Sequence, residues 1–598
     1  MGGSLFVHWK RILLARWKLS RASSAEPASI VVLCLIVSLG GGCLRSPTNP
    51  SVPEASPSPV ETGCATPTSY HTGDAALDGL QARYLPVLEA NRRSFAGRTG
   101  RVDGFGAGAA YPQIWLRDSA TLLPATRYIY PSVFLGSWLE EHLSHQMPNG
   151  ALWDWIASGE PAAFVASAPR ATRVYSSGGV ILSADKNTTA ADQESSAVDA
   201  AWKVFRLTGD RTWLAKPIDG RTLLDRLDAA LAYVESERLD EGLGLVVSAL
   251  TADWGDVSPA HADQRAIYQD EETPLAAGLY ANVFFSRAAD ELADMHEALG
   301  NLQRAQHWRQ VAESIRDRLD LHLWDSSGGF YRMHRAVLSG GREPFDDSHI
   351  FALGGNALAA LYGVASASKA GEIFATAEAR RRDLGIPSVA GVLMPPYPTG
   401  FFLHPILREA YTYQNGGLWD WWSGRFIQGL FQRGYSRTAR EQLDAVARRA
   451  AESGGLFEWY TRDGAGRGSD RYAGNVGALA GAIYEGLFGL ESSAAGLNVT
   501  LRLGSAAGGV RVCEPASGRT LAFEYEYQAD HRLAILRYES NAPGRGQLAV
   551  RLPERGATVR EVLLDGQPAS FTDVTVGEDD HIQITTDWAP HRLQVRIR

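Results

Sequence analysis

The stretch Leu223-Leu-Asp-Arg-Leu-Asp-Ala-Ala-Leu-Ala-Tyr-Val234 predicts how the body of the chain folds. Its apolar residues recur every three or four positions, which is the spacing of an amphipathic helix. The same spacing returns between Trp308 and Leu323, and similar segments alternate with loops rich in Gly and Pro from about residue 75 to 490. We therefore expect a mainly α body made of many helices.

The pattern changes after Gly496. Residues 521–527 (LAFEYEY) and the last residues of the chain alternate with a period of two, and turn signals such as Asp565-Gly566 lie between such runs. This period is typical of half-buried strands. About 100 residues of this kind predict a small antiparallel β-sandwich over residues 493–598, beside a helical domain over residues 73–492.

The first 43 residues resemble a targeting segment, with a basic start and an apolar run from Ile30 to Leu39. A run of ~10 residues is too short to span a bilayer but suits the core of a signal peptide. Gly40-Gly-Gly-Cys43 is similar to an imperfect lipobox, in which Cys43 would be acylated. Residues 44–72 are rich in Pro, Ser and Thr and predict a flexible tether. We expect export to the periplasm or cell surface, with Cys43 as the only membrane attachment.

Composition and charge limit the partners, metals and cofactors that we expect for this chain. The formal net charge of −9 comes without a basic tract, so we do not expect nucleic-acid binding. No Cys/His cluster appears among the four cysteines, so we expect neither a metal site nor a cofactor. After export and acylation, Cys64 and Cys513 would be the only unmodified thiols. They either stay free or form a disulfide, which requires their Cα atoms to lie within ~7 Å and could stabilise the fold by ~5 kcal/mol.

The first singular motif is residues 111–119 (YPQIWLRDS), where Arg117 and Asp118 follow Trp115. One interpretation is a helix start capped by Asp118 with a solvated arginine. The other is a clamp for vicinal hydroxyls, because Arg supplies fixed donors and Asp supplies acceptors. Two further short motifs combine hydrogen-bonding side chains with aromatic or small neighbours. One is Trp153 next to Asp154, and the other contains Asp192 and Glu194. The two acids are either helix caps or substrate contacts.

Residues 251–259 (TADWGDVSP) place Asp253 and Asp256 on either side of Trp254. A general acid needs a raised pKa, and burial beside an indole disfavours the charged carboxylate. A solvated acidic loop is the alternative reading. The indole argues against it, because Trp254 has little reason to lie in a solvated loop.

Two later motifs are densely aromatic. Residues 413–422 (YQNGGLWDWW) offer Gln414 and Asn415 as polar contacts and Trp419 as a stacking platform, although packing in the core would equally explain the tryptophans. Residues 454–460 (GGLFEWY) set Glu458 beside Trp459, an unusual place for a residue type that is seldom buried unpaired.

The order of these motifs resembles the six-hairpin glycosidases, especially the trehalase and processing α-glucosidase types. Gly255-Asp-Val-Ser-Pro259 is similar to their acid loop and implies Asp256 as the general acid, although Asp253 stands three residues away. Glu458, followed by a Gly-rich stretch, resembles their base loop. The Trp-Leu-Arg-Asp-Ser motif is similar to that of glucoamylases and exo-α-mannosidases, which implies that Arg117 and Asp118 hold the non-reducing sugar.

The resemblance covers roughly residues 75–490 and implies an (α/α)6 toroid that acts on carbohydrate. We expect an exo-acting, inverting glycoside hydrolase that cleaves an α-linked sugar, with the acid and base helped by a set of substrate-binding residues: Arg117, Asp118, Trp115, Trp153, Asp192, Glu194, Asp253, Trp254, Gln414, Asn415, Trp419 and Trp459. A phosphorylase on the same barrel and a non-catalytic sugar-binding protein are the alternatives. The sequence does not name the sugar, because no single family's full signature is present.

Overall fold

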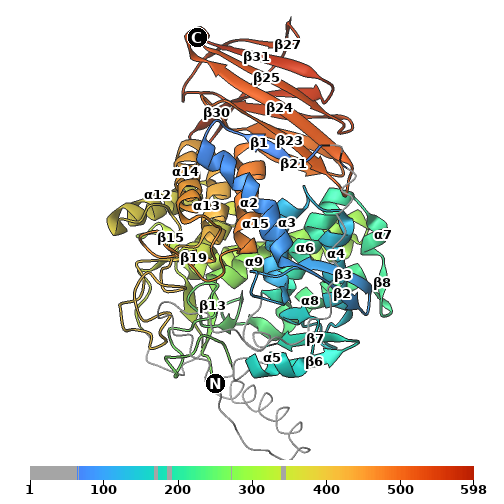
Figure 1. The fold of residues 1–598 in the computed structure, drawn as a ribbon, viewed down its shortest axis with the longest axis vertical. Helices are drawn as coiled ribbons and strands as arrows, with labels where there is room; N and C mark the ends of the chain where they lie inside the picture. Colours follow the sequence, from blue (N-terminus) through green and yellow to red (C-terminus); the bar gives the residue numbers. More distant parts are fainter. Residues whose placement is uncertain (1–63, 65, 168–172, 185–191, 271, 338–344) are drawn as a thin grey trace, which may run out of the picture. The chain divides into compact units, whose positions relative to one another are not determined.

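The computed structural model describes residues 64, 66–167, 173–184, 192–270, 272–337 and 345–598 (Figure 1). The predicted export segment, residues 1–43 with Cys43, lies outside the described residues, and so does most of the predicted tether. Among the described residues, no helix combines the length and apolarity that crossing a bilayer requires.

Six helices form a closed inner ring in which each contacts the next: α3 (Leu116–Thr126), α6 (Gln193–Thr208), α9 (Leu279–Ala298), α11 (Leu353–Leu361), α13 (Asp420–Gln432) and α15 (Ala473–Ala480), with α15 returning to α3. Nearly every residue of α13 and α15 is buried. A helix that is apolar or small on all sides belongs inside a protein rather than at its surface.

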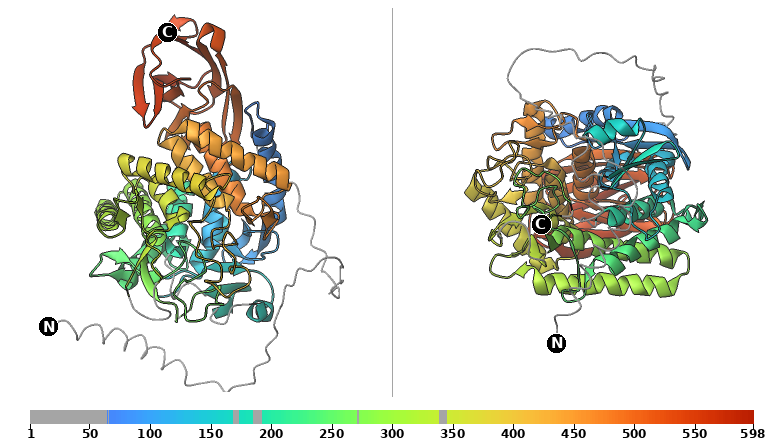
Figure 2. Two further views of the ribbon diagram at one scale, coloured as in Figure 1. Left: turned by 90° about the vertical axis from the view of Figure 1, so that its left-hand side faces the viewer. Right: turned by 90° about the horizontal axis from the view of Figure 1, so that it is seen from below.

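A second set of helices alternates with the first along the chain and packs outside it: α2 (Ala75–Asn91), α4 (Ser132–Ser144), α8 (Leu223–Arg238), α10 (Leu302–His322), α12 (Ala367–Leu384) and α14 (Ser436–Ser453). Several of these helices bury a single stripe, as Leu227, Leu231 and Val234 do in α8, whereas α4 is buried over most of its length. The pair α9 and α10 lies side by side in both views of Figure 2, in light green. The helical periodicities read from the sequence correspond to α8 and α10.

The C-terminal region consists of strands in two sheets. One sheet has the order β1 (Ser69–His71), β23 (Gly508–Glu514), β24 (Arg519–Gln528), β25 (Leu533–Ser540), β31 (His591–Ile597), β27 (Val559–Leu564) and β28 (Gln567–Pro568). The other has the order β21 (Leu490–Ser493), β22 (Gly496–Leu501), β26 (Arg545–Arg551), β30 (Asp579–Asp587) and β29 (Thr572–Val576). A helical body followed by a strand-rich region is therefore as predicted.

Three details differ from the prediction. The sheets are not purely antiparallel, because β22 and β26 run parallel. The end of the predicted tether forms β1, which pairs with β23 through main-chain hydrogen bonds that need no apolar pattern. The helical region also holds a four-stranded sheet of β4 (Ile114–Trp115), β5 (Trp155–Ala157), β7 (Val180–Ala184) and β6 (Arg173–Ser177). The mainly α class is therefore too narrow for the described residues.

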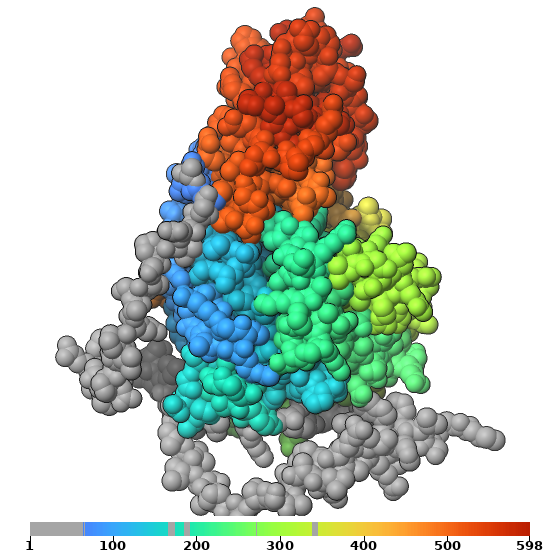
Figure 3. Space-filling view, turned by 90° about the vertical axis from the view of Figure 1, so that its right-hand side faces the viewer, coloured from blue at the N-terminus to red at the C-terminus, as the bar shows by residue number. Residues whose placement is uncertain are grey.

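Figure 3 shows the strand region, in orange and red, packed against the helical region, and both ring contacts and polar groups join the two, as in the pair Phe488 and Phe523 with ring centroids 5.9 Å apart. Arg127, just after α3, donates to Glu514 at 2.6 Å and to the carbonyl oxygen of Ser492 at 3.0 Å. The structure also contains a disulfide between Cys64 and Cys513, whose Cα atoms lie 6.2 Å apart. Of the two alternatives open at the sequence level, the cysteines therefore pair, and the bond ties the start of the described chain to β23.

Candidate active site

The predicted motifs gather where the inner helices begin. Asp118 lies in the first turn of α3, Asp192 is the N-cap residue of α6, and Trp419 and Tyr472 directly precede α13 and α15. Because the inner helices form a closed ring, loops that precede them meet at one end of it. Sequence positions up to 350 residues apart thus contribute to one site.

Glu458 is a buried acidic group held by two hydrogen bonds in this site. Its side chain is buried, and its Oε2 accepts hydrogen bonds from the Tyr111 hydroxyl and from the Ser469 main-chain N–H, both at 3.1 Å. Burial raises the pKa of Glu458, and the charges of Asp118 and Asp256 raise it further, whereas the two hydrogen bonds act against the rise. Asp118 and Asp256 therefore each lie within electrostatic reach of Glu458.

Three tyrosines surround these carboxylates. Tyr111 contacts Glu458, and the hydroxyl of Tyr472 donates to Asp118 at 3.3 Å. Burial, with the neighbouring negative charges, raises the pKa of Tyr111, Tyr413 and Tyr472. All three phenols thus stay neutral donors beside acidic groups. Tyr111 and Tyr413 stand in sequence motifs but were not predicted as site residues, because tyrosine at a motif edge also fits simple core packing, and Tyr472 lies outside those motifs.

Asp256 is half-buried and is held by a second loop. Its main-chain N–H donates to Oε1 of Gln414 at 2.8 Å, and Nε2 of Gln414 lies 3.4 Å from its carboxylate Oδ2. A Cβ on the neighbouring Gly255 would lie 2.5 Å from that same Oε1. Gly255 is thus required for the close approach of the two loops.

Asp253 has a different environment. Its carboxylate accepts from the main-chain N–H of Gly354 at 2.6 Å and from that of Gly355 at 3.0 Å, in the first turn of α11. This is where a carboxylate stabilises a helix N-terminus. Burial nevertheless raises the pKa of Asp253 to about 7. Both oxygens are therefore used to anchor the loop, and Asp256, rather than Asp253, lies in the electrostatic cluster with Glu458.

Arg117 and Asp192 form a buried ion pair, and Tyr280 donates to Oδ2 of the same aspartate at 3.3 Å. Asp192 does not cap α6 with its side chain, so the capping interpretation fails for this residue. A small cavity of about 30 Å³, room for roughly one or two waters, adjoins Arg117, Asp192 and Asp253. Neither Asp256 nor Glu458 lines it, so this cavity is a space beside the acid loop rather than between the two proposed catalytic carboxylates.

The tryptophans of the two aromatic loops pack together. Trp254 is buried, as its setting in the sequence implied, and its ring lies 5.0 Å from that of Trp419, 5.1 Å from Trp421 and 5.3 Å from Trp422. Trp419 also donates from Nε1 to the carbonyl oxygen of Tyr413 at 3.1 Å. These rings form the core under the site, which agrees with the packing interpretation and leaves contact with a ligand untested.

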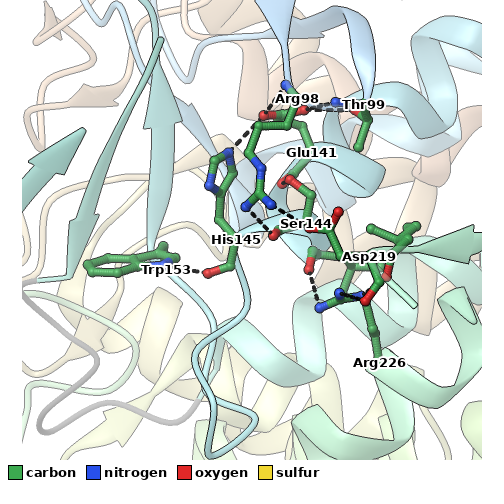
Figure 4. A network of polar contacts seen from close by, with 10 residues as sticks. Arg98, Thr99, Glu141, Ser144, His145, Trp153, Asp219 and Arg226 are labelled. Carbon is green, nitrogen blue, oxygen red and sulfur yellow. Dashed lines mark hydrogen bonds and ion pairs between the residues drawn. The ribbon is translucent and has the colours of Figure 1, made fainter. Parts of the chain in front are cut away.

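Trp153 and Glu194, two further predicted residues, make hydrogen bonds within the protein. Trp153 donates from Nε1 to the carbonyl oxygen of His145 at 2.8 Å, and Figure 4 shows this histidine held in turn by Glu141, at 2.7 Å. Glu194 accepts from the Leu152 main-chain N–H at 2.9 Å, and burial raises its pKa to about 7.

Three further predicted residues are engaged within the protein. The ring of Trp115 lies 6.0 Å from that of Trp155, and the ring of Trp459 lies 6.2 Å from that of Tyr413. The amide of Asn415 bonds the main chain of Tyr397 and Leu407. A substrate contact by any of these side chains stays a prediction.

Comparisons with known proteins show the family and the fold of this chain. A profile of the mannosylglycerate hydrolase MGH1-like glycoside hydrolase domain matches residues 111–473, which holds every residue of the predicted site. A search of curated proteins gives no match. Among solved structures, α-L-rhamnosidases from Dictyoglumus thermophilum (10% identity) and Aspergillus terreus (12%) are similar, each with a TM-score of 0.53 over 89% of this chain and 50% of theirs.

A mannosylglycerate hydrolase from Thermus thermophilus, in complex with Tris and D-glycerate, is 16% identical over 68% of this chain and all of its own, with a TM-score of 0.48. The chain thus spans about half the length of the rhamnosidases that it matches. At these identities, the two rhamnosidase structures show a shared fold.

Proposed function

We propose that this chain, which belongs to the mannosylglycerate hydrolase MGH1-like family of glycoside hydrolases, is an exo-acting, inverting enzyme that hydrolyses an α-linked sugar. We take the ring of inner helices, each followed by an outer helix, as the (α/α)6 toroid of the six-hairpin glycosidases. The observation that carries the proposal is the grouping of Asp118, in the first turn of α3, and Asp256, in the loop 251–259, around the buried Glu458, whose carboxylate is held by Tyr111 and Ser469.

In this proposal, Asp256 protonates the leaving oxygen and Glu458 takes a proton from the attacking water. The raised pKa of Glu458 suits a base, because a stronger base removes the proton more readily provided that it is still ionised at the working pH. Tyr111 and Ser469 fix the orientation of its carboxylate. Inversion further requires the two carboxyl groups to stand roughly 6.5–9.5 Å apart so that the water fits between base and sugar.

The substrate would enter over the N-terminal ends of the inner helices. Asp118, oriented by Tyr472, offers acceptors for sugar hydroxyls, and the neighbouring Arg117 is locked to Asp192 and so supports the same turn from behind. The family name points to an α-mannoside. We include α-glucosides, whose sugar is the C2 epimer of mannose, and α-L-rhamnosides, whose sugar is 6-deoxy-L-mannose, in the test.

The decisive experiment measures release of aryl alcohol from a panel of aryl α-glycosides and follows the new anomer by NMR. We expect the β-anomer of the released sugar to form first. Glu458→Gln should lower kcat by ~10²–10⁴-fold on every substrate, and Asp256→Asn should do so on glycosides whose leaving group needs a proton. First appearance of the α-anomer, or wild-type rates in both variants, would overturn the proposal. Turnover that requires phosphate would indicate a phosphorylase, and sugar binding without turnover would indicate a binding protein.

We also infer that the chain is exported. The disulfide between Cys64 and Cys513 supports this, because such bonds persist in oxidising compartments and are rare in the cytosol. Cell fractionation of the full chain, with and without Cys43→Ala, tests both the export and the lipid anchor. The variant should move from the membrane fraction to the soluble exported fraction.

A further inference from the structure

Both polar ends of the Gln414 side chain meet the same residue. Oε1 accepts the main-chain N–H of Asp256 at 2.8 Å, and Nε2 lies 3.4 Å from Oδ2 of its carboxylate. The chemistry of the amide links the two contacts. When Oε1 of Gln414 accepts from the Asp256 N–H, the NH₂ group is the end that can donate to the Asp256 carboxylate. Gln414 is 2% exposed, so water has little access to replace either contact.

The turn that presents Gln414 is strained and firmly fixed. Tyr411 and Tyr413 have φ values of 66° and 43°, in the left-handed region that residues other than glycine seldom occupy. Backbone hydrogen bonds join Tyr411 to Asn415 at 2.9 Å and Asn415 to Thr412 at 2.8 Å. The amide of Asn415 holds the turn from the other side. Strain of this kind persists where the surroundings fix the backbone, and it concentrates at functional sites.

The acid loop is also held by a second amide, through its main chain. Nε2 of Gln269 donates to the carbonyl oxygen of Gly255 at 3.0 Å. Gln269 and Gln414 therefore support the same loop, Gln269 through the Gly255 carbonyl and Gln414 through both the main chain and the side chain of Asp256. This difference provides a matched pair of residues for a test.

We propose that Gln414 is a positioning residue for the Asp256 carboxyl group, rather than a ligand of the sugar. The inference rests on the proposed function. Because Nε2 is a donor, Oδ2 is the oxygen that accepts from it, and the proton that Asp256 transfers is then favoured on Oδ1. The amide thus sets both the direction of the carboxyl group and the oxygen that carries the proton toward the leaving group.

A general acid matters in proportion to how poor the leaving group is. Dinitrophenolate departs without a proton, whereas an alkoxide needs one in the transition state. We therefore compare kcat for a 2,4-dinitrophenyl and an alkyl glycoside of the sugar that the panel selects. Gln414→Ala should lower kcat for the alkyl glycoside by ~10²-fold, the cost of a misplacement of about 1 Å. Its kcat for the dinitrophenyl glycoside should stay within about threefold of wild type.

Three outcomes are distinguishable. Gln269→Ala, which loosens the loop at the Gly255 carbonyl, should change the two substrates by the same factor. Asp256→Asn should show the strongest selective loss for the alkyl glycoside, and if it affects neither substrate the proposed function itself fails. If Asp256→Asn shows the selective loss but Gln414→Ala lowers both substrates equally, or lowers neither, the positioning role of Gln414 is wrong.

Discussion

Removal of one hydroxyl group should move the pH range in which this enzyme works. Tyr111 donates its hydroxyl to Oε2 of Glu458 at 3.1 Å, and this hydrogen bond favours the charged carboxylate. Tyr111→Phe keeps the ring and deletes only that donor. A hydrogen bond to a charged group contributes ~1.5–3 kcal/mol, and each pKa unit corresponds to about 1.4 kcal/mol. The pKa of Glu458, already raised by burial, should therefore rise by a further ~1–2 units.

The direction follows from the role of Glu458. A general base works only when ionised, so kcat/KM falls as the pH drops through the pKa of this group. A higher pKa moves the acidic limb of the profile to higher pH. At a pH well above the limb, the variant should keep most of its activity, because the base is ionised in both proteins.

The assay is kcat/KM against pH for wild type, Tyr111→Phe and Tyr472→Phe on one aryl glycoside. Tyr472→Phe is the matched control, since it deletes a hydroxyl from the same group of tyrosines but one that donates to Asp118. Only Tyr111→Phe should shift the acidic limb upward. An acidic limb that stays in place or moves downward in Tyr111→Phe would refute either the hydrogen bond or the role of Glu458 as base.

Three further predictions concern residues that hold the site or the fold in place. Gly468→Ala should lower kcat by at least ~10-fold, because its φ of 70° disfavours alanine and the new Cβ would collide with Oε2 of Glu458. Cys513→Ser should lower the free energy of unfolding by roughly 2–5 kcal/mol in denaturant titrations, whereas addition of a reductant to that variant should have no further effect. The pKa of Asp253 is about 7 in the folded protein, so its contribution to the free energy of unfolding is complete below pH ~4 and is lost as the pH rises through 7. Asp253→Asn removes this titration and should therefore reduce the decline of the free energy of unfolding with pH by up to about 1.4 kcal/mol per pH unit.

Helix periodicity predicted helices of the barrel, but it did not predict that the inner ring closes. The apolar stripe of residues 223–234 predicts a helix because burial on one face requires that spacing, and the structure buries that face in α8. The contact that closes the ring, between α15 and α3, joins segments about 350 residues apart and leaves no periodic signal in either of them. Similarly, β1 was assigned to the tether because its three residues are held by main-chain hydrogen bonds rather than by an apolar pattern.

The aromatic motifs predicted which loops form the candidate site, but they did not predict the role of each side chain in it. Glu458 among aromatic residues indicated an enclosed carboxylate, and burial is a property that neighbouring residues can reveal. The sequence predicts Gln414 as a sugar contact, and this stays a prediction. Its contact with Asp256, which lies 158 positions earlier, leaves no signal in the sequence, because only the folded backbone brings the two residues together.

The two aspartates of the acid loop show why composition could not assign the general acid. Both flank Trp254, and burial beside an indole would raise the pKa of either one. What separates them is the backbone: Asp253 has a φ of 59°, which turns its carboxylate toward the N–H groups of Gly354 and Gly355. A Cβ on Gly354 would lie 2.6 Å from that carboxylate, so this anchor depends on a glycine about 100 residues further along the chain. A carboxylate with both oxygens committed to a helix N-terminus cannot reach a substrate without breaking the turn that holds Asp256. The anchor of Asp253 on α11 therefore holds the loop from which Asp256 would act under the proposed function.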